Sequence, residues 1–588
     1  MRRADRSSVQ RGPWWICLLP AFAYKRFLLV TFLASGCACL AQTSPQALQA
    51  DEQPNTIAGT VVNAVTGAPV ARALVMTPGN SYAMLTDGEG HFEFTLPKAG
   101  SDGASRIEGQ QYTFPPFALI ARKPGFLDDP NRNPAQATPG TEITIPLLPE
   151  ALIKGRVTTS DDDPALGITV QLYSRQIQEG VFKWVQAGSA LANSSGEFRF
   201  AELLPGSYKL LTNEWMDNDR ATTVPGAQQY GFPPVYYPNV SDFAAAATVQ
   251  LTAGQTVQAD IPLARQPYYP VRIPVANADL NSGVNITVAV QGHHGPGYSL
   301  GYNANQQRIE GLLPPGNYLV QASTFGQNPL SGAVQLSVAG APAQGPSLTL
   351  TPTGSIDVHV VEEFTSTEPQ LSGAWNVGGR SIPVHGPRLY LQISAESAED
   401  FGQPGNSMLR PPTGANDDSL ILENLAPGRY WLHLHSSRGY VAAATMGGAD
   451  VLHEPFTVSP GSGTPIEITM RDDTAELDGT VAGLSVQSGT TGPTFSSRLS
   501  PPPASVNCIP APDSTGQFEQ LWVSPDGKFN LPTMAPGTYR LLASRSPQLN
   551  LPYRDAEAMR AYESKGQVVH LSAGQKVNVQ LPAIPSTD

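Results

Sequence analysis

Short runs of alternating apolar and polar residues, separated by turns rich in glycine, proline and aspartate, make up most of the chain. Clear examples are His91-Phe-Glu-Phe94, Glu197-Phe-Arg-Phe200 and Lys528-Phe-Asn-Leu531. A period of two predicts half-buried strands whose phenylalanines face a core. Helical periodicity is convincing only at residues 554–564, before a glycine stop at Gly566. The pattern therefore predicts an all-β chain of tandem antiparallel β-sandwich modules, with one short C-terminal helix that caps the last sandwich.

A Pro-Gly-x-Tyr segment recurs along the chain, with prolines 110, 112 and 109 residues apart. The copies are Pro205–Tyr208, Pro315–Tyr318, Pro427–Tyr430 and Pro536–Tyr539. Proline presets φ at the second position of a turn and glycine accepts a positive φ at the third, so we expect type II turns with the tyrosine opening the next strand. The spacing indicates a degenerate module of about 110 residues.

The repeat landmarks divide the chain into seven expected segments. They are a signal peptide at 1–41, a linker at 42–54, and β-sandwiches at 55–149, 150–266, 267–352, 353–472 and 473–588. The third sandwich is short and lacks a glycine-led opening strand, so the sequence leaves open whether it is a complete domain. Closing and opening strands are nearly contiguous, which predicts very short linkers and a semi-rigid string.

The N-terminal region carries the pattern of an export signal. A 15-residue apolar run at 27–41 follows Lys25 and Arg26 and is too short for a comfortable transmembrane helix. Cleavage after Ala41 is the first expectation. The alternative is that Leu33-Ala-Ser-Gly-Cys37, which looks like a shifted lipobox, makes Cys37 a lipid-bearing terminus. Both predict a protein of the periplasm, outer envelope or extracellular space, with membrane contact only through the signal or a Cys37 lipid.

Composition and charge exclude several classes of protein. The 55 glycines and 55 prolines lack the every-third-residue glycine of collagen. Beyond residue 41 the chain has 30 basic and 48 acidic residues, a formal charge of −18, which disfavours nucleic acid as a partner. Cys508 is the only cysteine beyond the leader, so an internal disulfide and a zinc knuckle are excluded. Stability has to come from several packed cores.

The first module resembles the carboxypeptidase regulatory-like domain, a prealbumin- or transthyretin-like β-sandwich. The residues that carry the resemblance are Gly59-Thr-Val-Val62, Gly67-Ala-Pro-Val70 and Thr86-Asp-Gly-Glu-Gly-His-Phe92. The match is fair in the second and fifth modules, and only the strand rhythm survives in the third and fourth. Tyr236-Tyr-Pro238, the following alanines and Gly254 are similar to exported multi-module acidobacterial proteins. The resemblance implies the fold and an extracytoplasmic setting; it does not imply peptidase activity, because the zinc domain of such enzymes is absent from this sequence.

Two motifs could support chemistry. Gly297-Tyr-Ser299-Leu-Gly301 matches the G-x-S-x-G pattern, with His293 and His294 upstream, but a nucleophile elbow needs a strand–turn–helix context that the sequence does not predict. His433 and His435 lie two apart on a predicted strand and could bind a metal with His453 or Asp450. We favour a chance match for the G-x-S-x-G string and a solvent-facing pair for the two histidines. We therefore expect no catalytic residue, metal or other cofactor.

Four aromatic residues gather in one loop-like stretch: Tyr230, Phe232, Tyr236 and Tyr237. They could stack on sugar rings, although packing between neighbouring sandwiches is the favoured alternative. The sequence as a whole predicts an exported, non-catalytic β-sandwich protein that acts as a cell-envelope spacer, adhesive or binding scaffold. The alternative is a carbohydrate-binding protein, since the resemblance extends to starch-binding-like folds. A serine hydrolase using Ser299 is the least favoured interpretation. Glycans or other envelope proteins are the expected partners.

Overall fold

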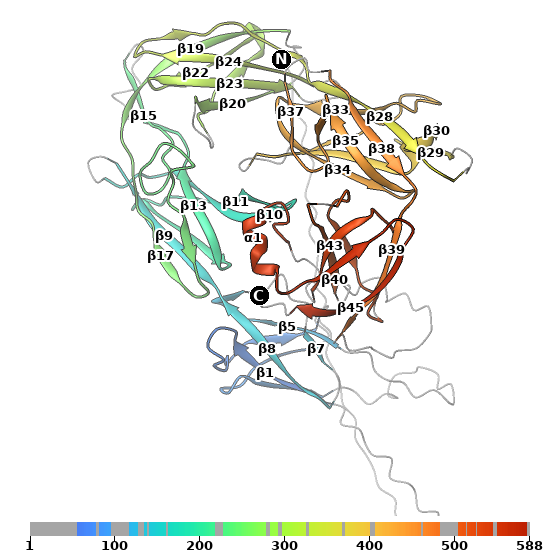
Figure 1. Ribbon diagram of the computed structural model, residues 1–588. Coiled ribbons are helices and arrows are strands. Elements are labelled where there is room, and N and C mark those ends of the chain that lie inside the picture. Colours follow the sequence, from blue (N-terminus) through green and yellow to red (C-terminus); the bar gives the residue numbers. More distant parts are fainter. Residues whose placement is uncertain are drawn as a thin grey trace, which may run out of the picture. The chain divides into compact units, whose positions relative to one another are not determined.

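The computed structural model describes most of the chain beyond the expected leader (Figure 1). The described residues are 56–77, 82–95, 117–127, 135–137, 140–159, 163–217, 227–277, 283–291, 297–324, 329–366, 371–399, 406–459, 463–482, 504–512, 514–524, 526–544 and 550–584. Five main apolar cores occupy residues 57–147, 151–263, 271–350, 356–470 and 475–581; we call them the first to fifth cores.

Two four-stranded sheets enclose the first core. Their strands are β1 (Thr56–Asn63), β2 (Leu74–Met76), β3 (Ala83–Leu85), β4 (His91–Thr95), β5 (Phe117–Arg122), β6 (Phe126–Leu127), β7 (Ala135–Ala137) and β8 (Glu142–Pro149). The second core has sheets ordered β11-β10-β13-β16 and β12-β9-β17, with β18 beside β9. These strands are β9 (Ala151–Thr158), β10 (Thr169–Gln178), β11 (Val181–Leu191), β12 (Glu197–Leu203), β13 (Gly206–Thr212), β16 (Val249–Leu251), β17 (Thr256–Gln258) and β18 (Ile261–Pro262).

The third core lies between a sheet ordered β20-β23-β24-β27 and one that includes β14-β15-β19-β22-β21. The strands are β14 (Trp215–Met216), β15 (Gln229–Phe232), β19 (Gln266–Ala276), β20 (Val284–Val290), β21 (Gly301–Asn303), β22 (Arg308–Leu313), β23 (Gly316–Thr324), β24 (Leu330–Val338), β25 (Ala343–Gln344), β26 (Leu348–Thr349) and β27 (Thr351–Pro352), with the 3-10 turn η1 (Ala304–Gln306). Because β15 pairs with β19, this sheet crosses the boundary expected at residue 266.

The fourth core is enclosed by the sheets β33-β28-β38-β35-β36 and β32-β31-β34-β37, beside a hairpin of β29 and β30. The elements are β28 (Gly354–Glu363), β29 (Ser372–Val377), β30 (Arg380–His385), η2 (Gly386–Leu389), β31 (Leu391–Ser397), β32 (Asn406–Met408), β33 (Leu420–Leu425), β34 (Gly428–Ser436), β35 (Tyr440–Met446), β36 (Ala449–Asp450), β37 (Phe456–Val458) and β38 (Ile466–Arg471). The fifth core has β39 (Ala475–Ala482), β40 (Ser505–Pro510), β41 (Glu519–Trp522), β42 (Lys528–Met534), β43 (Gly537–Ser544), β44 (Gln567–Leu571) and β45 (Lys576–Ile584).

One strand arrangement repeats in these cores. The opening strand pairs antiparallel with the strand before the repeat turn and parallel with the closing strand, as β1 does with β4 and β8. The same pattern holds for β9, β28 and β39. The structure confirms the all-β sandwich prediction, but the sheets are mixed rather than purely antiparallel. A parallel pair needs a long connection, and here the rest of the module supplies it.

The glycine of each glycine-led opening strand is a point of close backbone approach. A Cβ at Gly155 would lie 2.6 Å from the Phe198 ring, and closer still to the carbonyl oxygen of Ala259. Gly59 and Gly479 are enclosed in the same way by a phenylalanine of the antiparallel neighbour and a carbonyl of the parallel neighbour. The glycine is thus required because the ring and the closing strand fill the space that a side chain would occupy.

The Pro-Gly-x-Tyr segments differ from the predicted type II turns. Gly206, Gly316 and Gly428 begin strands and do not have a positive φ. Only at Gly316 would a side chain crowd the tyrosine two residues later, since a Cβ there would lie 3.0 Å from the Tyr318 hydroxyl oxygen; at Gly206 and Gly428 the corresponding contact is an ordinary 3.7 Å. The tyrosine hydroxyl donates a hydrogen bond to the carbonyl of the residue before proline. The four bonds are Tyr208 to Leu204, Tyr318 to Pro314, Tyr430 to Ala426 and Tyr539 to Ala535, at 2.8–2.9 Å.

The C-terminal helix is present but shorter than predicted. It consists of α1 (Ala556–Met559), drawn as a red coil in Figure 1, followed by the 3-10 turn η4 (Arg560–Tyr562). The Asp555 carboxylate accepts hydrogen bonds from two amides of the first turn, so Asp555 is the N-cap and the helix starts at Ala556. Met559 and Tyr562 pack on a small apolar cluster that includes Leu542, as expected for a cap on the last sandwich. In the described part of the chain, a helix of the length and apolarity needed to cross a membrane is not found.

Candidate functional site

A groove of about 450 Å³ runs along strand β34, beside the residues that lead into β41. Strand β34 alternates, with Tyr430, Leu432 and Leu434 buried in the fourth core. The intervening His433 and His435 therefore project from the other face, where both line the groove. Trp375, Met408, Phe518 and Glu519 are among the other lining residues.

Gln517 joins the fifth module to the edge of the groove. Its side-chain oxygen accepts a hydrogen bond from the Leu434 N–H at 3.0 Å. Its amide nitrogen donates to the carbonyl oxygens of Leu432 and Leu452, both at 3.2 Å. These bonds satisfy backbone groups that would otherwise lack a partner, and they hold residues 517–519 against β34.

A charged cluster surrounds His433. Its Nε2 lies 3.5 Å from a carboxylate oxygen of Glu179 and 3.9 Å from one of Glu396. Lys183 Nζ lies 2.8 Å from the other Glu396 oxygen, and these two side chains are 6% and 11% exposed. Burial, with Arg554 and Lys183 nearby, lowers the pKa of His433 to about 4 in spite of Glu396. The imidazole is consequently neutral at pH 7.

The donor atoms of Glu179, Glu396 and His433 lie within 4.8 Å of one another, a separation that a metal ion could bridge. However, Lys183 is already paired with Glu396, and the Arg554 guanidinium donates to the Glu179 carbonyl oxygen at 2.8 Å. Two fixed positive charges this close oppose a divalent cation. The residues fit an ion-pair network better than a metal site.

The histidines singled out in the sequence have separate partners. His435 Nδ1 lies 3.8 Å from Glu519, and His453 Nδ1 lies 2.8 Å from Asp450. The structure places neither His453 nor Asp450 with His433, whose carboxylates come from positions 179 and 396. Sequence reasoning missed both glutamates because Glu179 lies in the β10–β11 turn and Glu396 on β31, and the spacing of residues along the chain does not reveal that they approach His433.

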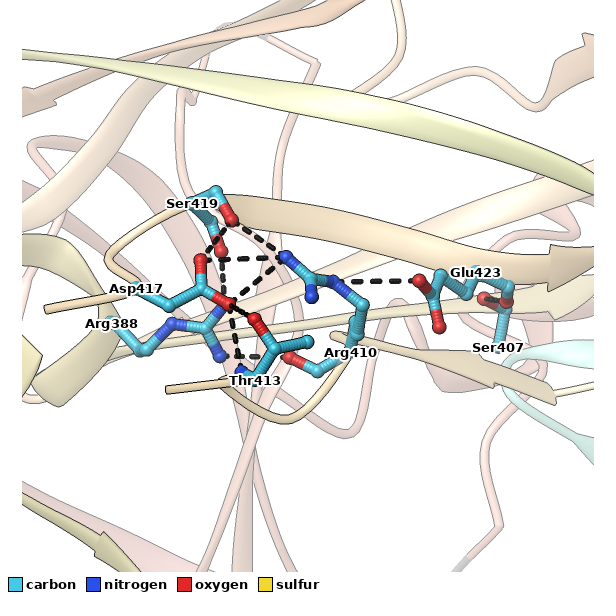
Figure 2. Close-up of polar contacts among 7 residues, drawn as sticks. All are labelled: Arg388, Ser407, Arg410, Thr413, Asp417, Ser419 and Glu423. Carbon is cyan, nitrogen blue, oxygen red and sulfur yellow. Dashed lines mark hydrogen bonds and ion pairs between the residues drawn. The ribbon is translucent and has the colours of Figure 1, made fainter. Parts of the chain in front are cut away.

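A second polar network lies around Arg388 and Arg410, and Figure 2 shows it with its partners. Arg388 is 1% exposed and donates to the carbonyl oxygens of Arg410 and Ser419. Arg410 pairs with Asp417 at 3.2 Å and with Glu423 at 3.4 Å. The two terminal nitrogens of the buried Arg388 guanidinium thereby have acceptors, which its desolvation requires.

Asp417 organises the loop between Arg410 and β33. Its carboxylate accepts hydrogen bonds from the amide and hydroxyl of Thr413, at 2.8 and 2.7 Å, and from the Ser419 hydroxyl at 2.5 Å. Those hydrogen bonds, with Arg410, hold the pKa of Asp417 well below its usual range. The loop is thus folded around a fixed anion.

The same network supports two walls of the groove. The Arg388 guanidinium carbon lies 5.5 Å from the centroid of the Trp375 ring, a cation–π distance. Strand β32, which carries Met408, is tied to β33 by a hydrogen bond from the Ser407 hydroxyl to the Glu423 carbonyl oxygen. These contacts fix Trp375 and β32 in two walls of the groove, an arrangement that favours ligand binding with little reorganisation.

The predicted ligand-contact aromatics have different surroundings. Phe232 and Tyr236 are 5% and 3% exposed and belong to apolar clusters, and Phe232 stacks on Trp215. Tyr237 is half-buried against the second core, and the Arg265 guanidinium covers one face of Tyr230 at 4.2 Å. Buried rings cannot stack on a sugar, so only Tyr230 and Tyr237 stay in the proposal of a ligand-contact surface.

Ser299 lies in a setting unlike a nucleophile elbow. Tyr298 forms a bridge to Val288, and the Ser299 N–H donates to the Glu214 carboxylate at 2.9 Å. Strand β21 and the turn η1 follow, so the helix that a nucleophile elbow needs is not found there.

His293 and His294 lie outside the described residues, as do Cys37 and Ala41. Cys508 is fully buried in the fifth core.

Comparisons with known proteins give structural likenesses only. No family model matches the chain, and no curated protein matches it. Similar solved structures include GBS52, the minor pilin of Streptococcus agalactiae, at 14% identity over 36% of this chain and 97% of that one, with a TM-score of 0.18. BcpA, the major pilin subunit of Bacillus cereus, is 8% identical over 55% and 99%, with a TM-score of 0.14. The shaft pilin SpaA of Lactobacillus rhamnosus GG is 10% identical over 35% and 98%, with a TM-score of 0.13. Likenesses this low support no inference about function.

Proposed function

We propose that the chain is an exported, non-catalytic β-sandwich protein that serves as a spacer, adhesive or binding scaffold of the cell envelope. The observation that carries the proposal is the buried ion pair between Lys183 and Glu396, which joins strands β11 and β31 although they are 213 residues apart. The most buried ion pair of the described residues thus fastens one sandwich to another instead of facing a cavity. Other envelope proteins or glycans are the partners that suit such a scaffold.

The proposal includes the division into a signal peptide at 1–41, a linker at 42–54 and sandwiches at 55–149, 150–266, 267–352, 353–472 and 473–588. The division into sandwiches is supported by the five main cores, each of which falls within one of these ranges. The proposal also includes the resemblance of the first module to the carboxypeptidase regulatory-like domain. Export predicts a mature N-terminus at Gln42, or an acylated Cys37, and mass spectrometry of the purified protein distinguishes the two.

The ion pair has the geometry that a buried pair needs. Lys183 Nζ also donates to the Ser397 carbonyl oxygen at 2.9 Å, so the ammonium has two acceptors. Arg554 adds a second connection, since its guanidinium lies 4.2 Å from the Trp431 ring centroid and also donates to Glu179. Removing one member of a buried pair is more costly than removing both, because an uncompensated charge is left behind.

The scaffold proposal is tested at this junction. We expect Lys183→Met to increase hydrogen exchange at the tip of the β10–β11 hairpin, and Lys183→Met with Glu396→Leu to restore part of the protection. Lys528→Met is the matched control, because Lys528 pairs with Asp526 on the surface. Unchanged hydrogen exchange in Lys183→Met would show that the ion pair does not hold the two sandwiches together.

Labelling of the wild type, but not of Ser299→Ala, by a fluorophosphonate probe would overturn the non-catalytic assignment.

A second candidate function is binding of a neutral glycan in the groove along β34. It is favoured by the combination of Trp375 with the hydrogen-bonding side chains of Gln392, Ser394 and His435. Titration with maltohexaose tests it, with Trp375→Ala as the variant and the exposed Trp522→Ala as the control. Tyr230→Ala and Tyr237→Ala test the remaining loop aromatics. Saturable binding lost in one of the test variants, and kept in the control, locates the site.

A further inference from the structure

A cleft of about 800 Å³ lies on the second sandwich, along the strands β9, β12 and β17. Strand β9 alternates, so Ile153 and Val157 face the core while Lys154 and Arg156 face outward. On β12, Phe198 and Phe200 face the core while Glu197 and Arg199 face outward. The outer face of this sheet therefore presents a row of charged side chains into the cleft.

Two of these charges are placed directly opposite each other. Arg199 on β12 is the register partner of Lys154 on β9, and Gln258 on β17 is the register partner of Lys154 on its other side. Like charges at directly opposed positions repel and destabilise a sheet. In the described part of the chain, neither Lys154 nor Arg199 has a side-chain ion pair or hydrogen bond. The two cations are thus adjacent, exposed and without a direct ion pair, in a chain of formal charge −13.

The acidic residues of the cleft are already engaged by neutral donors. The Glu197 carboxylate accepts a hydrogen bond from the Asn193 amide at 3.1 Å. Asp260 Oδ1 accepts from the Arg156 N–H at 2.8 Å and from the Gln258 amide at 2.6 Å. Arg156 is held by its own bond to the Ser195 carbonyl oxygen at 3.0 Å. Lys154 and Arg199 stay available for a ligand, and the two carboxylates keep free lone pairs at the rim.

We propose that this cleft binds an acidic oligosaccharide, one that carries carboxylates on hydroxyl-rich rings. Lys154 and Arg199 would hold a ring carboxylate, because a charge-assisted pair of donors suits that group. Glu197 and Asp260 would accept hydrogen bonds from ring hydroxyls, which a continuous polyphosphate does not offer. The exposed Leu191 side chain, 66% accessible at the cleft wall, would cover the C–H face of a sugar. Most of the lining side chains are charged or polar, which argues against the acyl chains of a lipid.

This inference rests on the proposed binding scaffold, and its test uses the full chain with trigalacturonate as the probe. We expect saturable binding by calorimetry that weakens with added salt and falls about tenfold or more in Lys154→Gln/Arg199→Gln, the loss expected for charge-assisted hydrogen bonds. Arg380→Gln/Arg429→Gln is the control, since it removes the same charge from two exposed arginines elsewhere and is expected to leave binding unchanged.

Three results would overturn the inference: no binding by the wild type, equal loss in both double variants, or equally tight binding of tripolyphosphate at the same residues, which would mark a general anion patch. A melting temperature equal to that of the wild type shows that the double variant is folded. Cleavage of trigalacturonate would contradict the non-catalytic function instead. Failure of the scaffold proposal and failure of this site are thus distinguishable.

Discussion

A tyrosine hydroxyl bonded to the carbonyl before proline explains why the repeat requires tyrosine and not another aromatic residue. Tyr208 donates to the Leu204 carbonyl oxygen at 2.8 Å from a ring that is buried in the second core. We expect Tyr208→Phe to lower the free energy of unfolding by about 1–2 kcal/mol, because it leaves that carbonyl without its partner. Urea denaturation measures the change. Tyr82→Phe, in a half-buried ring of the first core, is the control; an equal loss in both variants would contradict the role of the hydrogen bond.

Glu214 predicts a pH dependence at the residue scale. Its carboxylate is buried near Tyr268 and accepts the Ser299 amide, and burial raises its pKa from 4.5 to about 7. The folded protein therefore keeps the proton that the unfolded chain loses above pH 4.5. The contribution of Glu214 to the free energy of unfolding should be full below that pH and be lost, by about 3 kcal/mol, as the pH rises through 7. Denaturation at pH 4.5 and 7.5 measures this loss, and Glu214→Gln should remove it; an unchanged slope in the variant would refute the assignment.

At the scale of the element, the opening strand of a sandwich depends on one glycine. Gly155 lies between the Phe198 ring and the Ala259 carbonyl of the closing strand. We expect Gly155→Ala to destabilise the protein by about 1–3 kcal/mol or more, because the added methyl must push the two strands apart. Thermal unfolding measures the effect. Gly188→Ala is the matched control, since a Cβ there would lie 3.8 Å from its nearest neighbour; similar losses at both sites would rule out the packing explanation.

The strands, the repeat turn and the helix also show which features of an element can be predicted from its local sequence. The alternation in β12, β34 and β42 predicts their core faces, because period two is a property of a single strand. The glycine of Pro-Gly-x-Tyr was assigned the wrong role, because a glycine after proline indicates a type II turn, whereas Gly206, Gly316 and Gly428 begin strands without a positive φ. The helix was predicted to start too early because the capping strength of Asp555 was not used.

At the scale of the whole molecule, the second and third sandwiches share a sheet through β15 and β19. We expect a fragment of residues 150–266 to melt at a lower temperature than the second sandwich does in a fragment of residues 150–352. The shorter fragment ends at Gln266, so it lacks Pro267 and Tyr268, the β19 residues that pair with Tyr230 and Gln229 of β15. Strand β15 is then an edge strand. Calorimetry of the two fragments measures the difference. Equal melting temperatures would mean that the shared strands contribute no stability across the boundary.

The sequence by itself determined the all-β class, the module period and the core faces of individual strands. These follow from alternation and turn chemistry, which act between residues close together in the chain. Only the tertiary structure decided that Phe232 and Tyr236 are buried, that His433 meets Glu179 and Glu396, and that Lys154 lies opposite Arg199. Such contacts depend on the order of strands in each sheet and on the packing between sandwiches. Neither can be predicted from the pattern of residues along the chain.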